Sequence, residues 1–292
     1  MKKLILMSLL VFNIASCQKK KETNIKNNKV KENKMMNKTQ PIYAIKVHSI
    51  GAFEIFVNGI SIYSHKDKEA SIITLPINGD ILSSGVQLLQ IILHSADKLT
   101  KSELQNYSFK IVQYNGFDSP DVKVVQECIF NESLSKDKYT YLQSWTFEAI
   151  VPYKVTGWIY SFNLKEENKD HLLNEVQQFY LKTWNLINSG NYIEYYKIIE
   201  KRHKENLIAF YNLSEVNEEH NEIKQRILDA KGKMHPIDFS KFYLKIYSDG
   251  HLAVLEDKDG FSPLVYETDQ YTDYFGFILH RPKPGAPLEV IR

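Results

Sequence analysis

The sequence predicts a mixed fold, with an N-terminal antiparallel β-sandwich over residues 41–164 and a C-terminal α+β domain over residues 165–292. Two changes of pattern lead to this prediction. Up to about residue 162, short runs alternate between apolar and polar residues and are separated by turn residues, as is typical of sandwiches. From residue 165, apolar residues recur every three or four positions, and alternation then returns near residue 242. Helices followed by strands indicate an α+β unit.

In the first part, Tyr43, Ile45 and Val47 occupy alternate positions and predict a strand. Asn58-Gly59 separates two further alternating runs, around 53–57 and 60–62. This pair predicts a two-residue hairpin, because both turn positions favour a positive φ. We expect the remaining strands of the sandwich at residues 71–76, 86–94, 108–114, 122–130 and 144–151.

The second part begins with a helical pattern. The apolar stripe of a long helix comprises Leu172, Leu173, Val176, Phe179, Tyr180, Trp184 and Ile187. Asn188-Ser189-Gly190 predicts its end. We expect a short second helix over 192–199, and a third from 205 to about 230 with a break near Leu213-Ser214. Strands are expected at 242–247, 252–256, 264–267, 274–280 and 288–291, with a hairpin turn at Asp249-Gly250.

The N-terminus has the parts of an export signal. A basic start is followed by the apolar run 4–14 and by Ile14-Ala15-Ser16-Cys17. The run is about half the roughly 20 residues that a spanning helix needs. The last four residues resemble the bacterial lipobox, in which the Cys is acylated and becomes the first mature residue. The expectation is a lipoprotein signal peptide over 1–16 and a lipidated Cys17.

Acylation would anchor the protein to a membrane, because each buried methylene contributes about 0.8 kcal/mol. Gln18 follows the Cys, where an Asp would suggest retention at the inner membrane. The expected location is therefore the cell envelope, at the outer membrane facing the periplasm, with surface exposure as an alternative. Residues 17–40 are rich in Lys and Asn and poor in apolar residues, which predicts a disordered tether after the lipidated Cys.

Composition narrows the possible partners. The formal net charge is +2, and most of the excess lies in the tether, so no nucleic acid is expected as a partner. Cys128 is the second of two cysteines and lies in an apolar run, which indicates a buried, unreactive thiol. If Cys17 is acylated, no intramolecular disulfide can form.

Sequence motifs for catalysis are absent. The nine histidines show no His-x-His or His-x-x-x-His spacing, and the chain has no Gly-x-Ser-x-Gly elbow and no phosphate-binding glycine loop. We therefore expect no catalytic residue, no metal ligand set and no cofactor, and the protein is more readily a binding protein than an enzyme.

Tyrosines are frequent in the second half, and tyrosine-rich surfaces bind proteins and sugars well. An alternative interpretation is that these tyrosines cover a half-exposed sheet. The segment around Tyr271, Asp273 and Tyr274 is polar and aromatic, and we expect it to be a loop. The following tail contains Arg281 and several prolines. These four residues form the candidate binding surface.

Four segments carry a resemblance to known proteins. They are Phe53–Gly59, Pro76–Gly85, Phe147–Trp158 and Leu279–Ile291. With them the chain resembles a family of bacterial secreted or lipid-anchored proteins of unassigned function, over most of the mature chain; this likeness implies no activity. The second half, with its long helix and the element Trp184…Asn188–Tyr192, is weakly similar to nuclear-transport-factor-2-like folds. Such folds can hold a ligand in the concavity of the sheet, although a fold does not fix a function.

Three functions remain open from the sequence. The first is a lipid-anchored, non-catalytic module that binds a protein partner, for example an immunity-type inhibitor of a toxin. The second is an envelope hydrolase whose site lies between the domains and leaves no local motif. The third is a lipoprotein that binds a sugar or a lipid.

Overall fold

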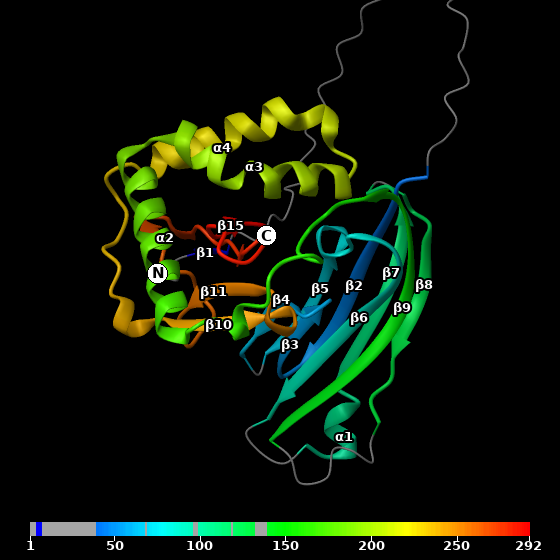
Figure 1. Cartoon of the computed structure of the whole chain (residues 1–292). Coiled ribbons are helices and arrows are strands. Elements are labelled where there is room, and N and C mark those ends of the chain that lie inside the picture. Colours follow the sequence, from blue (N-terminus) through cyan, green and yellow to red (C-terminus); the bar gives the residue numbers. More distant parts are fainter. Residues whose placement is uncertain (1–3, 8–38, 68, 96–98, 118, 132–138) are drawn as a thin grey trace, which may run out of the picture.

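The computed structural model describes residues 4–7, 39–67, 69–95, 99–117, 119–131 and 139–292. Antiparallel strands come first, then helices, then antiparallel strands again, so the predicted fold class is confirmed (Figure 1). We call residues 41–154 the sandwich unit and residues 164–292 the α+β unit. None of the helices in the described part of the chain is long and apolar enough to cross a membrane.

The sandwich unit consists of two four-stranded antiparallel sheets. The first has the order β5 (Ala70–Pro76), β2 (Pro41–Ile50), β7 (Tyr107–Asn115) and β8 (Val122–Cys128). The second has the order β4 (Ile60–His65), β3 (Ala52–Val57), β6 (Ser83–His94) and β9 (Thr140–Lys154). A short helix, α1 (Lys101–Leu104), precedes β7.

Apolar side chains from both sheets fill the space between them. Phe53 and Phe109 are buried and meet edge to face, with their ring centroids 5.2 Å apart. Cys128 lies in this core, and burial raises the pKa of its thiol to about 12, so the thiol stays protonated.

The predicted hairpin at Asn58-Gly59 is confirmed. Both residues have positive φ, 50° and 79°, and the turn joins β3 to β4. The turn also contacts the α+β unit, because the Ser248 N–H donates to the Gly59 carbonyl oxygen (3.0 Å). A Cβ on Gly59 would lie 2.8 Å from the Ser248 Cα, so the approach itself requires glycine.

Three helices open the α+β unit: α2 (Lys169–Ser189), α3 (Tyr192–Ala209) and α4 (Val216–Ala230). Gly190 ends α2 in the left-handed conformation, as predicted. The expected short second helix is wrong in length: α3 runs on to Ala209, and the break before α4 spans 210–215. Residues after 199 are rich in charge, yet His203 and Glu205 among them are buried.

Two small sheets complete the α+β unit. One has the order β10 (Tyr243–Tyr247), β11 (Leu252–Glu256), β14 (Leu279–His280) and β15 (Glu289–Val290). The other contains β12 (Val265–Glu267) and β13 (Tyr271–Tyr274), and β1 (Leu4–Met7) lies parallel to β13 at its edge. The loop expected around Tyr271 is therefore wrong, because these residues form a strand.

A third apolar cluster joins the two units. It contains Ile60 and Leu82 from the sandwich unit, Val155 and Trp158 from the connecting segment, and Leu252 and Ile291 from the α+β unit. The Trp158 indole N–H donates to the Ser248 hydroxyl (2.8 Å). Asn78, which is fully buried, also donates to the carbonyl oxygen of Ala209 at the end of α3 (3.0 Å). These contacts hold the units together on either side of a cleft.

Candidate functional site

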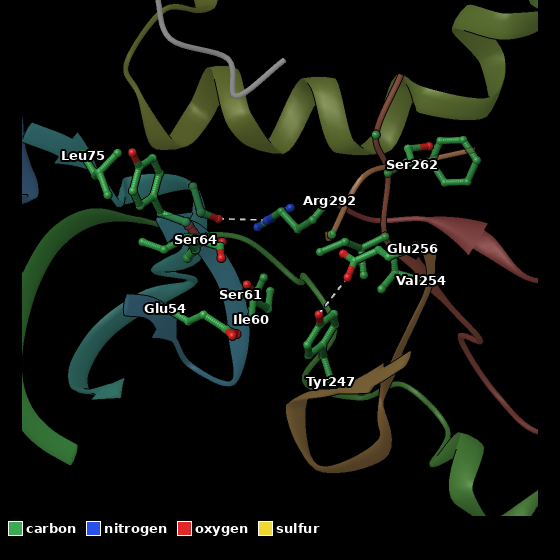
Figure 2. Close-up of a pocket in the computed structure, with 18 of the residues that line it drawn as sticks. Glu54, Ile60, Ser61, Ser64, Leu75, Tyr247, Val254, Glu256, Ser262 and Arg292 are labelled. Atoms are coloured by element: carbon green, nitrogen blue, oxygen red, sulfur yellow. Dashed lines mark hydrogen bonds between the residues drawn. The ribbon is translucent and has the colours of Figure 1, made fainter. Parts of the chain in front are cut away.

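A cleft of about 980 Å³ lies between the sandwich unit and the α+β unit. Figure 1 shows β3 and β4 on the side of the sandwich that faces β10 and β11. In Figure 2, Ser64 and Leu75 lie opposite Val254, Glu256 and Ser262, with Arg292 between them. Cavities of roughly 300–1,000 Å³ between domains are where small ligands usually bind.

The wall on the sandwich side is formed by parts of two edge strands, β4 and β5. Residues 60–67, which comprise β4 and the residues after it, all line the cleft, and so do residues 74–76 of β5. Within the described residues, β4 and β5 are the edge strands of their sheets at this side. The open side of the sandwich, where both sheets end, therefore faces the cleft.

The opposite wall comes from the α+β unit. The Tyr247 hydroxyl donates to Glu256 Oε2 (3.2 Å), and the Lys245 ammonium lies 2.9 Å from the same carboxylate oxygen. Burial, and then the negative charge of Glu256, raise the pKa of Tyr247. Across the cleft, Glu54 of β3 accepts from His94 (3.0 Å). The carboxylates of Glu54 and Glu256 therefore already have partners within the protein.

One end of the cleft lies against α3, and Arg292 is its best-anchored residue. The Arg292 Nε donates to the Gly79 carbonyl oxygen (2.8 Å), and Nη1 donates to Glu205 Oε2 (3.0 Å). Its guanidinium lies 5.2 Å from the centre of the Trp158 ring. Glu205 also accepts from the N–H of Gly157 in the connecting segment (3.1 Å). Arg292 thus links the sandwich unit, the connecting segment and α3.

Some polar groups at this α3 end have no partner. Arg292 Nη2 and Asn206 Oδ1 are buried, and neither has a hydrogen-bond partner within the described part of the chain. Such atoms are uncommon, since a buried polar atom without a partner costs about 1–3 kcal/mol. The pair comprises one donor and one acceptor, and both residues line the cleft.

Asp80 lies beside them. Removal of water raises the pKa of its carboxyl from 3.8 to about 6, although the positive charge of Arg292 acts in the opposite direction. Arg202 donates to the Gly276 carbonyl oxygen (2.8 Å), and burial lowers the pKa of its guanidinium. A strongly shifted carboxyl in a cleft is a mark of functional sites, and also of structural ion-pair networks.

Formal charges in the lining balance. The described lining residues include five carboxylates and five cations: Glu54, Asp67, Asp80, Glu256 and Asp259, and Lys66, Arg202, Lys245, Lys258 and Arg292. Aromatic rings of Tyr63, Tyr114, Phe117, Phe210, Tyr247, Phe261, Tyr274 and Phe277 lie among them. A mixed lining without one dominant sign fits a ligand that is close to neutral and both donates and accepts hydrogen bonds.

The candidate surface expected from the sequence is not one surface. Asp273 is 3% exposed and makes a two-pronged pair with Arg226, at 2.7 Å for each bond. Arg281 is 4% exposed and is held by Glu167 and Glu175. Asp273 and Arg281 are therefore held in buried ion pairs, and a binding surface formed by the four residues stays a prediction. Tyr271 is half-buried, and its hydroxyl lies 3.2 Å from that of Tyr266.

Tyr274 is the one member of the predicted set that lines the cleft, where its ring stacks on Phe261 with the centroids 4.8 Å apart. The other cleft residues come from many separate segments of the chain and share no motif. The closest sequence signal was the Asn58-Gly59 hairpin, which positions β4.

Two other polar clusters have the residue types of a functional site. Ser161 Oγ lies 2.6 Å from His280 Nδ1, and His280 Nε2 lies 3.6 Å from Glu289. This resembles a Ser–His–acid array, but Ser161 is 8% and His280 2% exposed. Burial also lowers the pKa of His280 to about 4, so the ring is neutral at pH 7. The cluster fastens the connecting segment to β14.

Glu167, His171 and Glu175 present ligand atoms within 4.8 Å of one another, which is a spacing that suits a metal. The Arg281 guanidinium already pairs with both carboxylates, so a cation of the protein itself neutralises them. Cys17, the rest of the expected signal after Met7, and the tether as far as residue 38 lie outside the described residues.

Comparison of the chain with protein-family models, with curated proteins and with solved structures gives no match.

Proposed function

We propose that this protein is a non-catalytic binding protein that holds its ligand in the cleft between the sandwich unit and the α+β unit. The observation that carries the proposal is the cleft itself, about 980 Å³ in volume, with walls from both units. A site of this size between two units can enclose a ligand and exclude water from its polar contacts.

The cleft is a better site than the tyrosine-rich segment around β13. Asp273 and Arg281 cannot reach a partner while they are buried in ion pairs. In contrast, the α3 end of the cleft keeps Arg292 Nη2 and Asn206 Oδ1 without partners. Both residues line the cleft, so a ligand that reaches these atoms would remove an existing cost.

Anchoring through Cys17 is part of the same proposal, and its support is the lipobox-like sequence before that residue. A lipid anchor followed by a Lys- and Asn-rich tether would hold the cleft near the membrane of the envelope. Mass spectrometry of the protein from its own cells tests this. A Cys17→Ser protein that still carries acyl chains, or stays in the membrane fraction, would contradict the anchoring.

A filled cleft tests the binding proposal. In Ser61→Trp the indole occupies the wall formed by β4, whereas Ser108→Trp places the same side chain at an exposed position on β7, away from the cleft. The melting temperature of the full-length chain is measured against a panel of peptides, oligosaccharides and lipids. A ligand stabilises the folded state by mass action, so stabilisation is expected for the wild type and Ser108→Trp and not for Ser61→Trp. Equal stabilisation of all three proteins would place the site elsewhere.

One observation favours a second function, hydrolysis of a bound polymer. The Asp80 carboxyl lies in the cleft with a pKa of about 6, which suits a general acid or base near neutral pH. Turnover of an oligosaccharide or peptide by the wild type, lost in Asp80→Asn with the ligand still bound, would establish this function and overturn the non-catalytic one.

A further inference from the structure

We propose that the occupant of the cleft is an extended polypeptide segment of a partner protein, which adds as a strand to the free edge of β4. This inference rests on the proposed function and names the chemistry of its ligand. Addition of a peptide strand to an exposed sheet edge is a common mode of recognition, in which main-chain hydrogen bonds supply affinity and neighbouring pockets supply specificity.

The cleft meets β4 along its edge. Successive side chains of a strand point to opposite faces, so a hollow against one face touches every second residue. Here the lining includes every residue from Ile60 to Asp67. A cavity that touches both sets of side chains lies beside the strand, where the unpaired main-chain groups are.

The main-chain groups on that side have no strand partner within the described residues, since β4 pairs with β3 alone. Val57 faces Ile60 across the two-residue turn, and Phe56 faces Ser61; the register then shifts at a β-bulge, so that Ile55 faces Tyr63 and Ile62 is the extra residue. The pair that closes a two-residue turn is of the hydrogen-bonded kind, so the next pair, Phe56 with Ser61, is of the non-hydrogen-bonded kind. The N–H and C=O of Ser61 therefore point away from β3 and toward the cleft.

The sequence of β4 leaves this edge unguarded. Proteins usually protect an exposed edge with proline, lysine or another charge. Ile60-Ser61-Ile62-Tyr63-Ser64-His65 contains no Pro, Lys, Arg, Asp or Glu, whereas the neighbouring edge strand β5 ends in Pro76 and the edge strand β10 carries Lys245. The opposite wall of the cleft covers β4 instead.

The cleft also has groups for the side chains of such a segment. The formal charges of the lining cancel, so a segment with little net charge, or with both signs, fits best. At the α3 end, Arg292 Nη2 is a donor and Asn206 Oδ1 an acceptor, both buried and without a partner in the described residues, and a peptide that reaches them would supply the complementary carbonyl and N–H. A peptide backbone offers both groups in regular alternation.

The test uses a phage-displayed library of random peptides, selected on the full-length wild-type chain. Selected peptides are synthesised with single N-methyl groups along the backbone, and their dissociation constants are measured. We expect a loss of about tenfold or more at every second amide and little loss between, because alternate amides point toward β4.

Two variants of one residue supply the control on the protein. Ser61→Pro removes the N–H that faces the cleft without removing a bond to β3, and it should weaken binding by about tenfold. Ser61→Ala keeps the N–H and should bind within about twofold of the wild type. If Ser61→Pro fails to fold, the N-methyl series on the wild-type protein still tests whether the peptide adds as a strand.

Several results would overturn the inference. Peptides that bind without a two-residue period in the N-methyl series, or equally to Ser61→Pro and the wild type, would exclude strand addition. An oligosaccharide or lipid that stabilises the wild type but not Ser61→Trp, with no peptide selected, would leave the cleft as the site and replace the peptide. If no ligand of any class distinguishes Ser61→Trp from Ser108→Trp, the proposed function fails as well.

Discussion

At the scale of single residues, the buried charges show why this chain is difficult to interpret from its sequence. Arg281 lies in a basic, proline-rich tail, a composition typical of the surface, yet its guanidinium pairs with Glu167 and Glu175, more than 100 positions earlier. Asp273 is similarly paired with Arg226, 47 positions away. Charge patterns along the chain cannot reveal partners that only the fold brings together.

The role of Arg281 leads to a prediction about stability. Arg281→Ala should lower the free energy of unfolding by about 3–5 kcal/mol, because it leaves two carboxylates in a site with little water. Lys283→Ala, an exposed position two residues away, should change it by less than about 0.5 kcal/mol. Urea denaturation measures both. Equal, small effects of the two substitutions would mean that the ion pairs of Arg281 contribute no more to stability than an exposed side chain does.

Asp80 predicts a pH dependence. Its pKa is raised in the folded state to about 6 from 3.8, so its contribution to stability is fully present below about pH 3.8 and is lost as the pH rises through 6. Asp80→Asn cannot lose a proton. The stability of the wild type minus that of Asp80→Asn should therefore fall between pH 4 and pH 7, as followed by urea midpoints. A difference that rises with pH would show that Arg292 outweighs desolvation.

At the scale of elements, local signals worked where the local chain decides the structure. Asn58-Gly59 and Gly190 adopt the positive φ values that their residue types favour. The length of α3 could not be predicted, since His203 and Glu205 in its charged run are buried by tertiary contacts. The polar residues Thr272 and Asp273 predict a loop where the structure has the strand β13, and Asp273 is buried there in an ion pair with Arg226.

The hairpin turn gives an element-scale prediction about how the units are joined. Gly59→Ala should cost both the strain of a positive φ, about 1–2 kcal/mol, and the displacement of Ser248. Gly116→Ala has a similar φ of 88° but open space around its Cβ, so it should cost the strain alone. Thermal unfolding of the two variants compares them. Equal losses of stability in the two variants would mean that the contact between Gly59 and Ser248 leaves room for a Cβ.

At the scale of the whole molecule, the proposed binding site depends on how the two units dock. The fold class could be predicted from periodicity, because each unit is formed by local patterns of strands and helices. The cleft could not, because it is lined by β4, β5, α3, β11 and the C-terminal residue Arg292, which come together only when the units dock. A site of this kind leaves no motif in the sequence.

The docked arrangement depends on Glu205, which accepts from both Gly157 and Arg292. Glu205→Gln keeps the shape of the side chain and removes its charge. We expect weaker binding in the cleft together with a lower melting temperature, since Arg292 loses the partner that orients it. Glu194→Gln, at an exposed position on the same helix, serves as the control. Unchanged binding in Glu205→Gln would show that the orientation of Arg292 by Glu205 does not contribute to ligand binding.

Hydrogen–deuterium exchange of the full-length chain, with and without the most stabilising ligand of the peptide, oligosaccharide and lipid panel, tests the central claim most directly. The account predicts that exchange slows at residues 60–67 and at residues 254–262 together, because the ligand lies between these two walls. Slowing confined to residues 271–281, or to one unit alone, would contradict a binding site in the cleft.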